Sequence, residues 1–197
     1  MGDADAHDPA ARPAAETAAD VLGFWLAAGP DKWFAADPGF DAEVGVHLLP
    51  LHEAAAADRL SGWAGTAEGA LALVLLLDQV PRNAFRGTRR AFASDPSALA
   101  VAEAALARGD DDPARLGRFA DLARFFYLPL MHAEDPGRQA RCADLYRRIG
   151  DADGLKYALM HQEIIDRFGR FPHRNPVLGR VMRPEEQAFL DAGGFKG

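Results

Sequence analysis

The stretch TAEGALALVLLL, Thr66–Leu77, decides the fold of this chain. A helix here would begin at Thr66, whose side chain suits an N-cap, and would be apolar on every side through Leu77. Neighbouring elements cover a helix of that kind, which does not lie at the surface. The apolar run is also far shorter than the ~20 residues that cross a bilayer. We therefore expect a central helix within a globular core.

Helical signals continue on both sides of this stretch. Apolar residues recur every three or four positions, and no segment shows sustained alternation of apolar and polar residues. Asp37-Pro38 and Asp95-Pro96 each offer an N-cap followed by proline at the first helical position. Pro50 should break or kink the helix that contains it. The pattern predicts an all-α fold of about eight helices without a sheet.

Length and composition indicate one domain. A chain of 197 residues can bury about 70% of its extended surface. Residues 1–16 show no apolar period, so we expect a disordered tail there and a single all-helical domain over residues 17–197. The net charge of -7 and the pI of about 5.3 make nucleic acid or an anionic membrane surface an unfavourable partner.

Cysteine usage and the N-terminus favour a cytoplasmic protein. Cys142 is the single cysteine, which excludes an internal disulfide and a CxxC zinc site. The acidic N-terminus lacks the apolar segment of a signal peptide, and no stretch is long enough to span a membrane. No pattern indicates a cofactor or a metal, and none indicates the oligomeric state.

Three stretches combine an apolar helix with an unusually polar end. They are LLLDQVPRNAFRG (75–87), FFYLPLMHAED (125–135) and HQEIIDRFGRFPHRNPVLGR (161–180). The last is too polar for a core and too aromatic for a flexible linker. If the three helix ends meet in space, they form one site rich in arginine and histidine.

The same stretches resemble a known bacterial family, domain of unknown function 924. The similarity extends to the aromatic pairs near Trp25 and Trp33, to RAFASDP, and to PEEQAFL near the C-terminus, so it covers nearly the whole chain from Val21. The resemblance implies a tetratricopeptide-like right-handed superhelix of helices and implies no activity. Ala133 and Met182-Arg183 depart from the family, which usually has serine at the first position and Ser-Thr at the second.

In PRNAFRG, Arg82 and Arg86 are four residues apart, so a helical turn would place both guanidinium groups on one side. Such a pair suits a carboxylate or phosphate ligand, with Asn83 as an additional donor. The alternative is structural: Asp78 pairs with Arg82 at i,i+4, and Arg86 caps carbonyl groups at the helix end.

In MHAED, a histidine lies beside two carboxylates. His132 could transfer a proton with the help of Glu134. Alternatively, Glu134 and Asp135 begin the next helix, with Pro136 just inside it.

In the last stretch, two prolines stiffen a loop that presents His173, Arg174 and Asn175. Gly169 should end the helix, and the prolines should hold Phe171 and Asn175 extended. The acids Glu163 and Asp166 can pair with Arg167 and Arg170 at i,i+4. His161 faces the apolar stripe of the helix, where a histidine is either a hydrogen-bonded core residue or a proton-transfer group.

Three hypotheses follow. The first is a pocket at the helix ends that binds a small anionic molecule, with or without catalysis. The second is a tetratricopeptide-like module that binds a peptide or protein, for which Trp33, Trp63 or Tyr146 should be exposed in a groove. The third is that the polar stretches only lock helix ends together. For the first, the candidate proton-transfer residues are His132 and His161, and the candidate ligand-binding residues are Asp78, Arg82, Asn83, Arg86, Glu134, Arg170, His173, Arg174 and Asn175.

Overall fold

A computed structural model describes residues 15–196, and these residues form helices without a strand. The longer α-helices are α1 (Ala18–Ala28), α3 (Pro38–Ala56), α4 (Ala67–Val74), α6 (Asp95–Ala107), α9 (Pro136–Ile149), α10 (Ala152–Phe168) and α12 (Pro184–Asp191). The shorter ones are α2 (Pro30–Trp33), α5 (Val80–Ala84), α7 (Pro113–Leu116), α8 (Leu128–Met131) and α11 (Asn175–Leu178). The 3₁₀ segments are Ser61–Gly65, Arg89–Phe92, Gly117–Phe126 and Pro172–Arg174, and Leu75–Gln79 is a π-helix.

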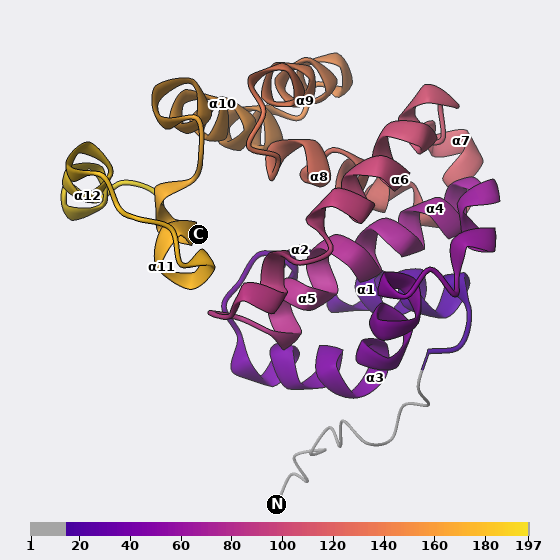
Figure 1. Cartoon of the computed structure of the whole chain (residues 1–197). Helices are drawn as coiled ribbons and strands as arrows, with labels where there is room; N and C mark the ends of the chain where they lie inside the picture. The colour runs from indigo at the N-terminus through magenta and orange to yellow at the C-terminus, as the bar shows by residue number, and fades with distance from the viewer. Residues whose placement is uncertain (1–14, 197) are drawn as a thin grey trace, which may run out of the picture.

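The predicted central helix is confirmed. Helix α4 continues through the π-helix into α5, so one helical rod covers residues 67–84. Thr66 caps it by accepting a hydrogen bond from the backbone N–H of Gly69. From Gly69 to Pro81 every residue of the rod is buried, because α1, α3 and α6 pack around it (Figure 1). Burial on all sides follows from its sequence, which is apolar all round through Leu77.

The structure corrects two predictions about helix number and breaks. Between residues 15 and 196 there are twelve α-helical segments, four of them single turns, where the sequence predicted about eight helices. Pro50 does not break its helix: α3 runs from Pro38 to Ala56 through it. Pro50 lies on the exposed face, as does Val46, whose carbonyl loses its helical partner there. Water can hydrate that carbonyl, so the helix tolerates the proline.

The segment Leu116–Met131 is also less regular than its apolar stripe predicted. The structure divides it into a 3₁₀ segment, Gly117–Phe126, and the short helix α8. Gly117 has a φ of 53°, and Pro129 lies within α8, so neither end favours one long α-helix. This division leaves His132 as the C-cap of α8, where its side chain faces the central rod.

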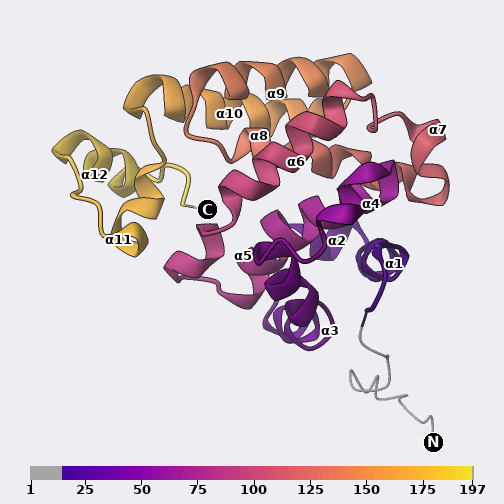
Figure 2. The same cartoon turned by 45° about the vertical axis from the view of Figure 1, so that its right-hand side comes forward.

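The C-terminal third forms a second layer. Helices α9 and α10 pack against each other, and α8 lies beneath them beside α6 (Figure 2). The end of α10 and the segment after it share a small apolar cluster, made by Ile164, Ile165, Phe168 and Phe171 with Phe189 and Phe195 packed against it. This cluster is separate from the main core, and it holds α12 against α10.

Three further expectations concern membrane-spanning helices, the N-terminal tail and the superhelix. No helix between residues 15 and 196 is long and apolar enough to cross a membrane. The predicted disordered tail lies outside the described residues, apart from Ala15 and Glu16. The right-handed, tetratricopeptide-like superhelix stays a prediction.

Candidate functional site

The π-helix is the element that presents Asp78. Its wider turn is closed by a hydrogen bond from the N–H of Val80 to the carbonyl of Leu75. Side chains outside the rod satisfy the next two carbonyl groups: Nδ1 of His52 lies 2.8 Å from the oxygen of Leu76, and the hydroxyl of Ser94 donates to Leu77 at 2.6 Å. π-Helical turns are rare and often found at functional sites.

Both carboxylate oxygens of Asp78 are engaged, and the residue has no exposed surface. One oxygen lies 2.8 Å from Nδ1 of His132 and 3.2 Å from a guanidinium nitrogen of Arg82. The other accepts a hydrogen bond from Gln79. Burial alone would raise the pKa of Asp78, but Arg82 and His132 outweigh it and hold that pKa well below its usual range. Asp78 is therefore ionised and can only accept hydrogen bonds.

The ionised carboxylate fixes the state of His132. Since Asp78 only accepts, Nδ1 of His132 carries the hydrogen, and Nε2 is the acceptor nitrogen of the neutral ring. Burial and the charge of Arg82 lower the pKa of His132 despite the opposing effect of Asp78. Nε2 makes no hydrogen bond with the described residues, and 16% of the side chain is exposed. His132 is thus a neutral imidazole with one nitrogen held and the other open.

Asp95 links the two arginines of the site. It accepts two hydrogen bonds from Arg82, at 2.9 and 3.1 Å, and one from Arg174 at 3.3 Å. Asp95 is the first residue of α6, and Ser94 occupies the N-cap position, so the predicted capping role of Asp95 is wrong. We call Asp78, Arg82, Asp95, His132 and Arg174 the central cluster.

The two arginines of the central cluster differ in how well their charges are compensated. Burial would lower the pKa of Arg82, but Asp78 and Asp95 outweigh it and raise that pKa. Arg174 is 7% exposed, and its burial, together with the nearby charge of Arg82, lowers its pKa to about 10. Its guanidinium lies between the rings of Phe92 and Phe171, 4.7 and 4.6 Å from their centroids. Its Nε is buried and has no hydrogen-bond partner among the described residues.

Two further histidines lie on the other side of Phe171. His161 and His173 contact the ring of Phe171 and also that of Phe195, with centroid distances between 4.6 and 5.7 Å. Nδ1 of His161 lies 2.8 Å from the carbonyl of Tyr157, so His161 is a hydrogen-bonded core residue. Burial lowers the pKa of His161 to about 4, and burial together with Arg174 lowers that of His173 to about 3. Nδ1 of His173 is buried without a partner among the described residues.

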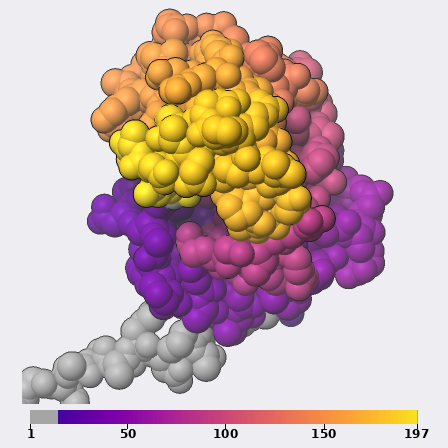
Figure 3. Space-filling model, turned by 60° about the vertical axis from the view of Figure 1, so that its left-hand side comes forward, coloured from indigo at the N-terminus to yellow at the C-terminus, as the bar shows by residue number. Residues whose placement is uncertain are grey.

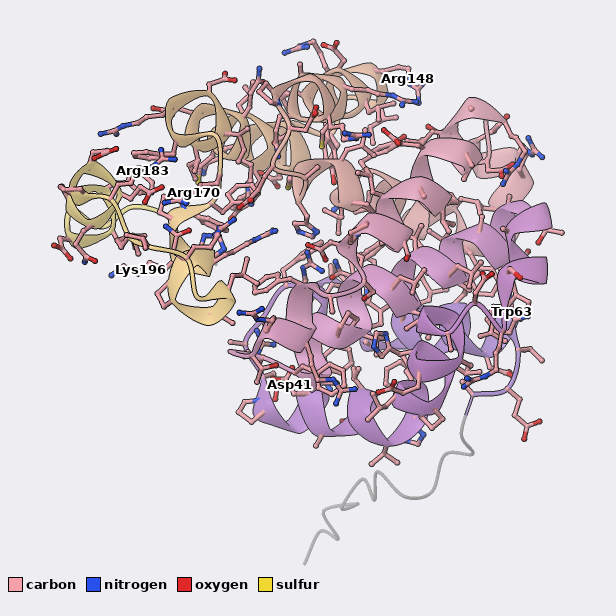
Figure 4. The ribbon with its side chains drawn as sticks, in the orientation of Figure 1. Asp41, Trp63, Arg148, Arg170, Arg183 and Lys196 are labelled. Atoms are coloured by element: carbon pink, nitrogen blue, oxygen red, sulfur yellow. The ribbon has the colours of Figure 1, made fainter. Side chains whose placement is uncertain are left out.

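Ion pairs fasten the loop after α10 at two points. Glu134 accepts from both Nη atoms of Arg180, at 2.6 and 2.9 Å, and from the N–H of Phe171. Glu186, which has no exposed surface, accepts two bonds from Arg170, at 2.6 and 2.8 Å, and one from Asn175 at 3.0 Å. Figure 4 shows Arg170 between α10 and α12.

These contacts correct several details predicted for the loop. Arg170 pairs with Glu186 rather than with Asp166. Gly169 ends α10 with a φ of 71°, as expected, and Phe171 is extended, but Asn175 has α-helical angles because it begins α11. The N–H of Arg183 at the start of α12 donates to Glu186, so this helix start is held without the family's usual Ser-Thr.

Asn83 and Arg86 lie in a different place from the central cluster. Arg86 donates two hydrogen bonds of 2.8 Å to Asp41 on α3, and Asn83 donates a third of 2.8 Å. The alternative interpretation, in which Arg86 caps carbonyl groups at the helix end, is therefore wrong. Figure 4 labels Asp41 on α3, apart from the C-terminal residues Arg170 and Arg183.

The structure thus brings together Asp78, Arg82, His132 and Arg174 from three distant stretches. His161 and His173 contact the ring of Phe171, which also contacts Arg174. It does not bring Asn83, Arg86 or Arg170 into the central cluster. The surface is hollowed between the C-terminal segment, drawn in yellow, and the N-terminal helices, in indigo and purple (Figure 3). Between residues 15 and 196, no group of three or more His, Cys, Asp and Glu side chains could hold a metal ion.

Five partners of the predicted site residues were missed at the sequence level: Asp41, Gln79, Asp95, Arg180 and Glu186. Gln79, Asp95, Arg180 and Glu186 lie within the stretches that carry the family resemblance, so the stretches themselves were the available signal. Asp41 showed no local pattern that would indicate a partner far away in the sequence.

Comparison with known proteins identifies the family of this chain. Residues 21–194 match the model of a family described as a bacterial protein of unknown function, DUF924. The chain belongs to this family. The match confirms the resemblance seen in the three polar stretches.

A solved structure of a protein of unknown function from Agrobacterium tumefaciens is similar to the chain. The two are 48% identical, the alignment covers 89% of this chain and 97% of the other, and the TM-score is 0.83. No curated protein matches the chain.

Proposed function

We propose that the central cluster binds a small anionic molecule and that His132 exchanges a proton with it. The observation that carries the proposal is Arg174: a buried guanidinium with a lowered pKa, one contact to Asp95 and an Nε without a partner. An oxygen of a bound anion would accept a hydrogen bond from Nε of Arg174 and offset the part of the guanidinium charge that Asp95 does not. Arg82 is already paired with two carboxylates, so its main role is to hold Asp78 and Asp95.

Proton transfer fits the state of His132. Its Nε2 carries a lone pair at neutral pH, because the pKa of the ring is lowered and Asp78 holds the hydrogen on Nδ1. A neutral imidazole whose second nitrogen is oriented by a buried carboxylate is a suitable general base. The ligand would therefore place an acidic proton, or a water to be activated, beside Nε2 and its anionic group beside Arg174.

The peptide-binding alternative has less support. Trp33, Trp63 or Tyr146 was expected to be exposed in that case; Trp33 and Tyr146 are 7% and 2% exposed, and Trp63 is partly buried against the core. Trp33 donates a hydrogen bond to the carbonyl of Trp25, and the ring of Tyr146 meets that of Tyr127 edge to face, so both serve the core. The scaffolding alternative applies best to Asn83, Arg86, Arg170 and Asn175, whose polar groups pair with Asp41 or Glu186.

Thermal melts with inorganic phosphate, acetate, citrate and AMP test the binding proposal. An anion that binds only the folded state at a hundred times its Kd stabilises it by about 2.7 kcal/mol. The wild type should melt at a higher temperature with at least one of these anions, and Arg174→Met should lose the increase. Arg86→Met, at the remote Asp41 pair, should retain it. An equal increase in both variants, or none in the wild type, would contradict the proposal.

Proton transfer needs a separate measurement. We expect His132→Gln to keep the anion-induced shift, because Arg174 is intact. Any turnover of phosphate or carboxylate esters by the wild type should fall by about 100-fold or more in that variant. Turnover that survives in His132→Gln would leave anion binding in place and remove the catalytic role.

A further inference from the structure

A polar pocket lies beside the π-helix, where His52 and Ser94 bond to the carbonyl groups of Leu76 and Leu77. It has a volume of about 280 Å³ and is lined by His52, Glu53, Ala56, Arg90, Ala93, Ser94 and Ser97. Ligand pockets are typically about 300–1,000 Å³, so this one suits a very small ligand. Its residues come from α3, from the 3₁₀ segment Arg89–Phe92, and from the start of α6. None of them belongs to the central cluster.

The floor of this pocket offers hydrogen-bond acceptors. His52 is 5% exposed, and since the carbonyl of Leu76 can only accept, Nδ1 of His52 carries the hydrogen. With the hydrogen on Nδ1, Nε2 has no hydrogen-bond partner among residues 15–196 and is the ring nitrogen left to accept from a ligand. Ser94 is 7% exposed and donates its hydroxyl hydrogen to Leu77, so its oxygen can only accept from a ligand. A ligand must therefore bring donors to the floor.

The rim carries one charge of each sign. Arg90 and Glu53 form an ion pair with side chains 59% and 48% exposed. The guanidinium of Arg90 stacks on Phe85, 3.7 Å from the ring centroid, which fixes its position at the mouth. An exposed ion pair contributes little to stability, so a ligand that carries both charges can replace it readily.

We propose that this pocket binds a small α-amino acid as its zwitterion. The ammonium group lies between floor and rim, where Nε2 of His52 and the oxygen of Ser94 accept two of its hydrogens from the floor and the carboxylate of Glu53 accepts the third from the rim. The carboxylate lies at the rim and pairs with Arg90 through two parallel hydrogen bonds. The side chain must be small, because the volume is small and Ala56 and Ala93 form the apolar walls. Glycine, alanine and serine fit this description.

Isothermal titration calorimetry of the full chain tests this site. The probes are glycine, L-alanine and L-serine, with ethylamine and acetate as compounds that carry only one of the two charges. At least one amino acid should bind with a Kd at least tenfold lower than those of ethylamine and acetate. Equal binding of acetate would overturn the proposal in favour of a simple anion site, and binding by none of the three amino acids would overturn it altogether.

Two exposed residues provide variants that fold. Arg90→Gln and Glu53→Gln should each raise the Kd of the amino acid by tenfold or more, because each removes one of the two charges that the zwitterion needs. Arg174→Met, in the central cluster, should leave that Kd unchanged, which separates this site from the proposed anion site. An unchanged Kd in Arg90→Gln would overturn the proposal.

Discussion

Asp78 and His132 are 54 positions apart in the sequence, yet a carboxylate oxygen of one lies 2.8 Å from Nδ1 of the other. The contact joins the π-helix in the central rod to the end of α8 in the second layer. The aspartate has no exposed surface, and the side chain of the histidine is 16% exposed. The pair therefore ties two layers of the fold together and also sets the tautomer of the histidine.

Replacing Asp78 by Asn tests how the pair works. Since Asp78 is the main group that raises the pKa of His132, its loss should lower that pKa further. Removing one partner of a buried charge pair should also cost about 3–5 kcal/mol of stability, because the charge of Arg82 then loses part of its compensation. NMR titration of the histidine ring and urea denaturation measure the two effects. Asp41→Asn, at the separate Arg86 pair, is the control and should leave His132 unchanged.

The two arginines of the central cluster should respond differently to the same substitution. Arg82→Met leaves both Asp78 and Asp95 short of their main partner and should cost about 3–5 kcal/mol. Arg174→Met keeps an unbranched side chain between Phe92 and Phe171 and removes a charge that burial disfavours. Its stability should stay within about 1 kcal/mol of the wild type, because Asp95 retains Arg82. Urea denaturation measures the free energy of unfolding of both variants. A large loss of stability in Arg174→Met would show that Arg174 is a structural residue.

The sequence predicted the helices well where a local signal was sufficient. Thr66 and Asp37 cap their helices, Asp135 caps α9, and Gly169 ends α10. These features depend on residues within one turn of each other. The extended conformation predicted for Asn175 was wrong, and Pro50 does not break α3, because these outcomes depend on the next helix and on exposure, which a local pattern does not contain.

The sequence predicted most residues of the central cluster but not which of them pair with one another. The three polar stretches supplied Asp78, Arg82, His132 and Arg174, which do meet. Local sequence patterns could not show that Asp95 holds both arginines, since Arg174 is 79 positions away from it. That contact sets the electrostatics of the cluster, because Asp95 offsets the charges of Arg82 and Arg174 together.

The C-terminal segment should loosen when Glu186 loses its charge. Its carboxylate accepts four hydrogen bonds: two from Arg170, one from Asn175 and one from the N–H of Arg183. The bond to Arg170 and that to the N–H of Arg183 also lower the pKa of Glu186 to about 2. In Glu186→Gln the backbone amides of residues 170–191 should exchange hydrogen about tenfold faster or more, while those of α4 stay protected.

The neighbouring residue gives a matched control for this experiment. Glu185 lies in the same turn of α12 and is exposed. Glu185→Gln should leave hydrogen exchange unchanged in both regions. Faster exchange throughout the chain in Glu186→Gln would instead show that the C-terminal segment unfolds together with the rest.

Acid should destabilise the protein through its buried histidines before most carboxylates titrate. His161 and His173 have folded pKa values of about 4 and about 3, below the ordinary value of 6.5. At a pH between the folded and unfolded pKa values, the unfolded chain binds more protons than the folded protein. The stability that the neutral histidines contribute is therefore fully present above pH 6.5 and falls as the pH decreases toward 4. Each histidine contributes a slope of up to about 1.4 kcal/mol per pH unit in this window. Glu186, with a folded pKa of about 2, adds its own loss only below about pH 4.5.

His161→Phe separates this effect from a general response to acid. Phenylalanine keeps the ring contacts to Phe171 and Phe195 but cannot take up a proton. The free energy of unfolding, measured by urea denaturation from pH 4.5 to 7.5, should therefore depend less steeply on pH by up to about 1.4 kcal/mol per unit. The variant loses the hydrogen bond to the Tyr157 carbonyl, so it should be less stable than the wild type at pH 7.5 and closer to it at pH 4.5. Parallel pH profiles for the two proteins would show that His161 has the same pKa in the folded and unfolded states, which would contradict the lowering of its pKa by burial.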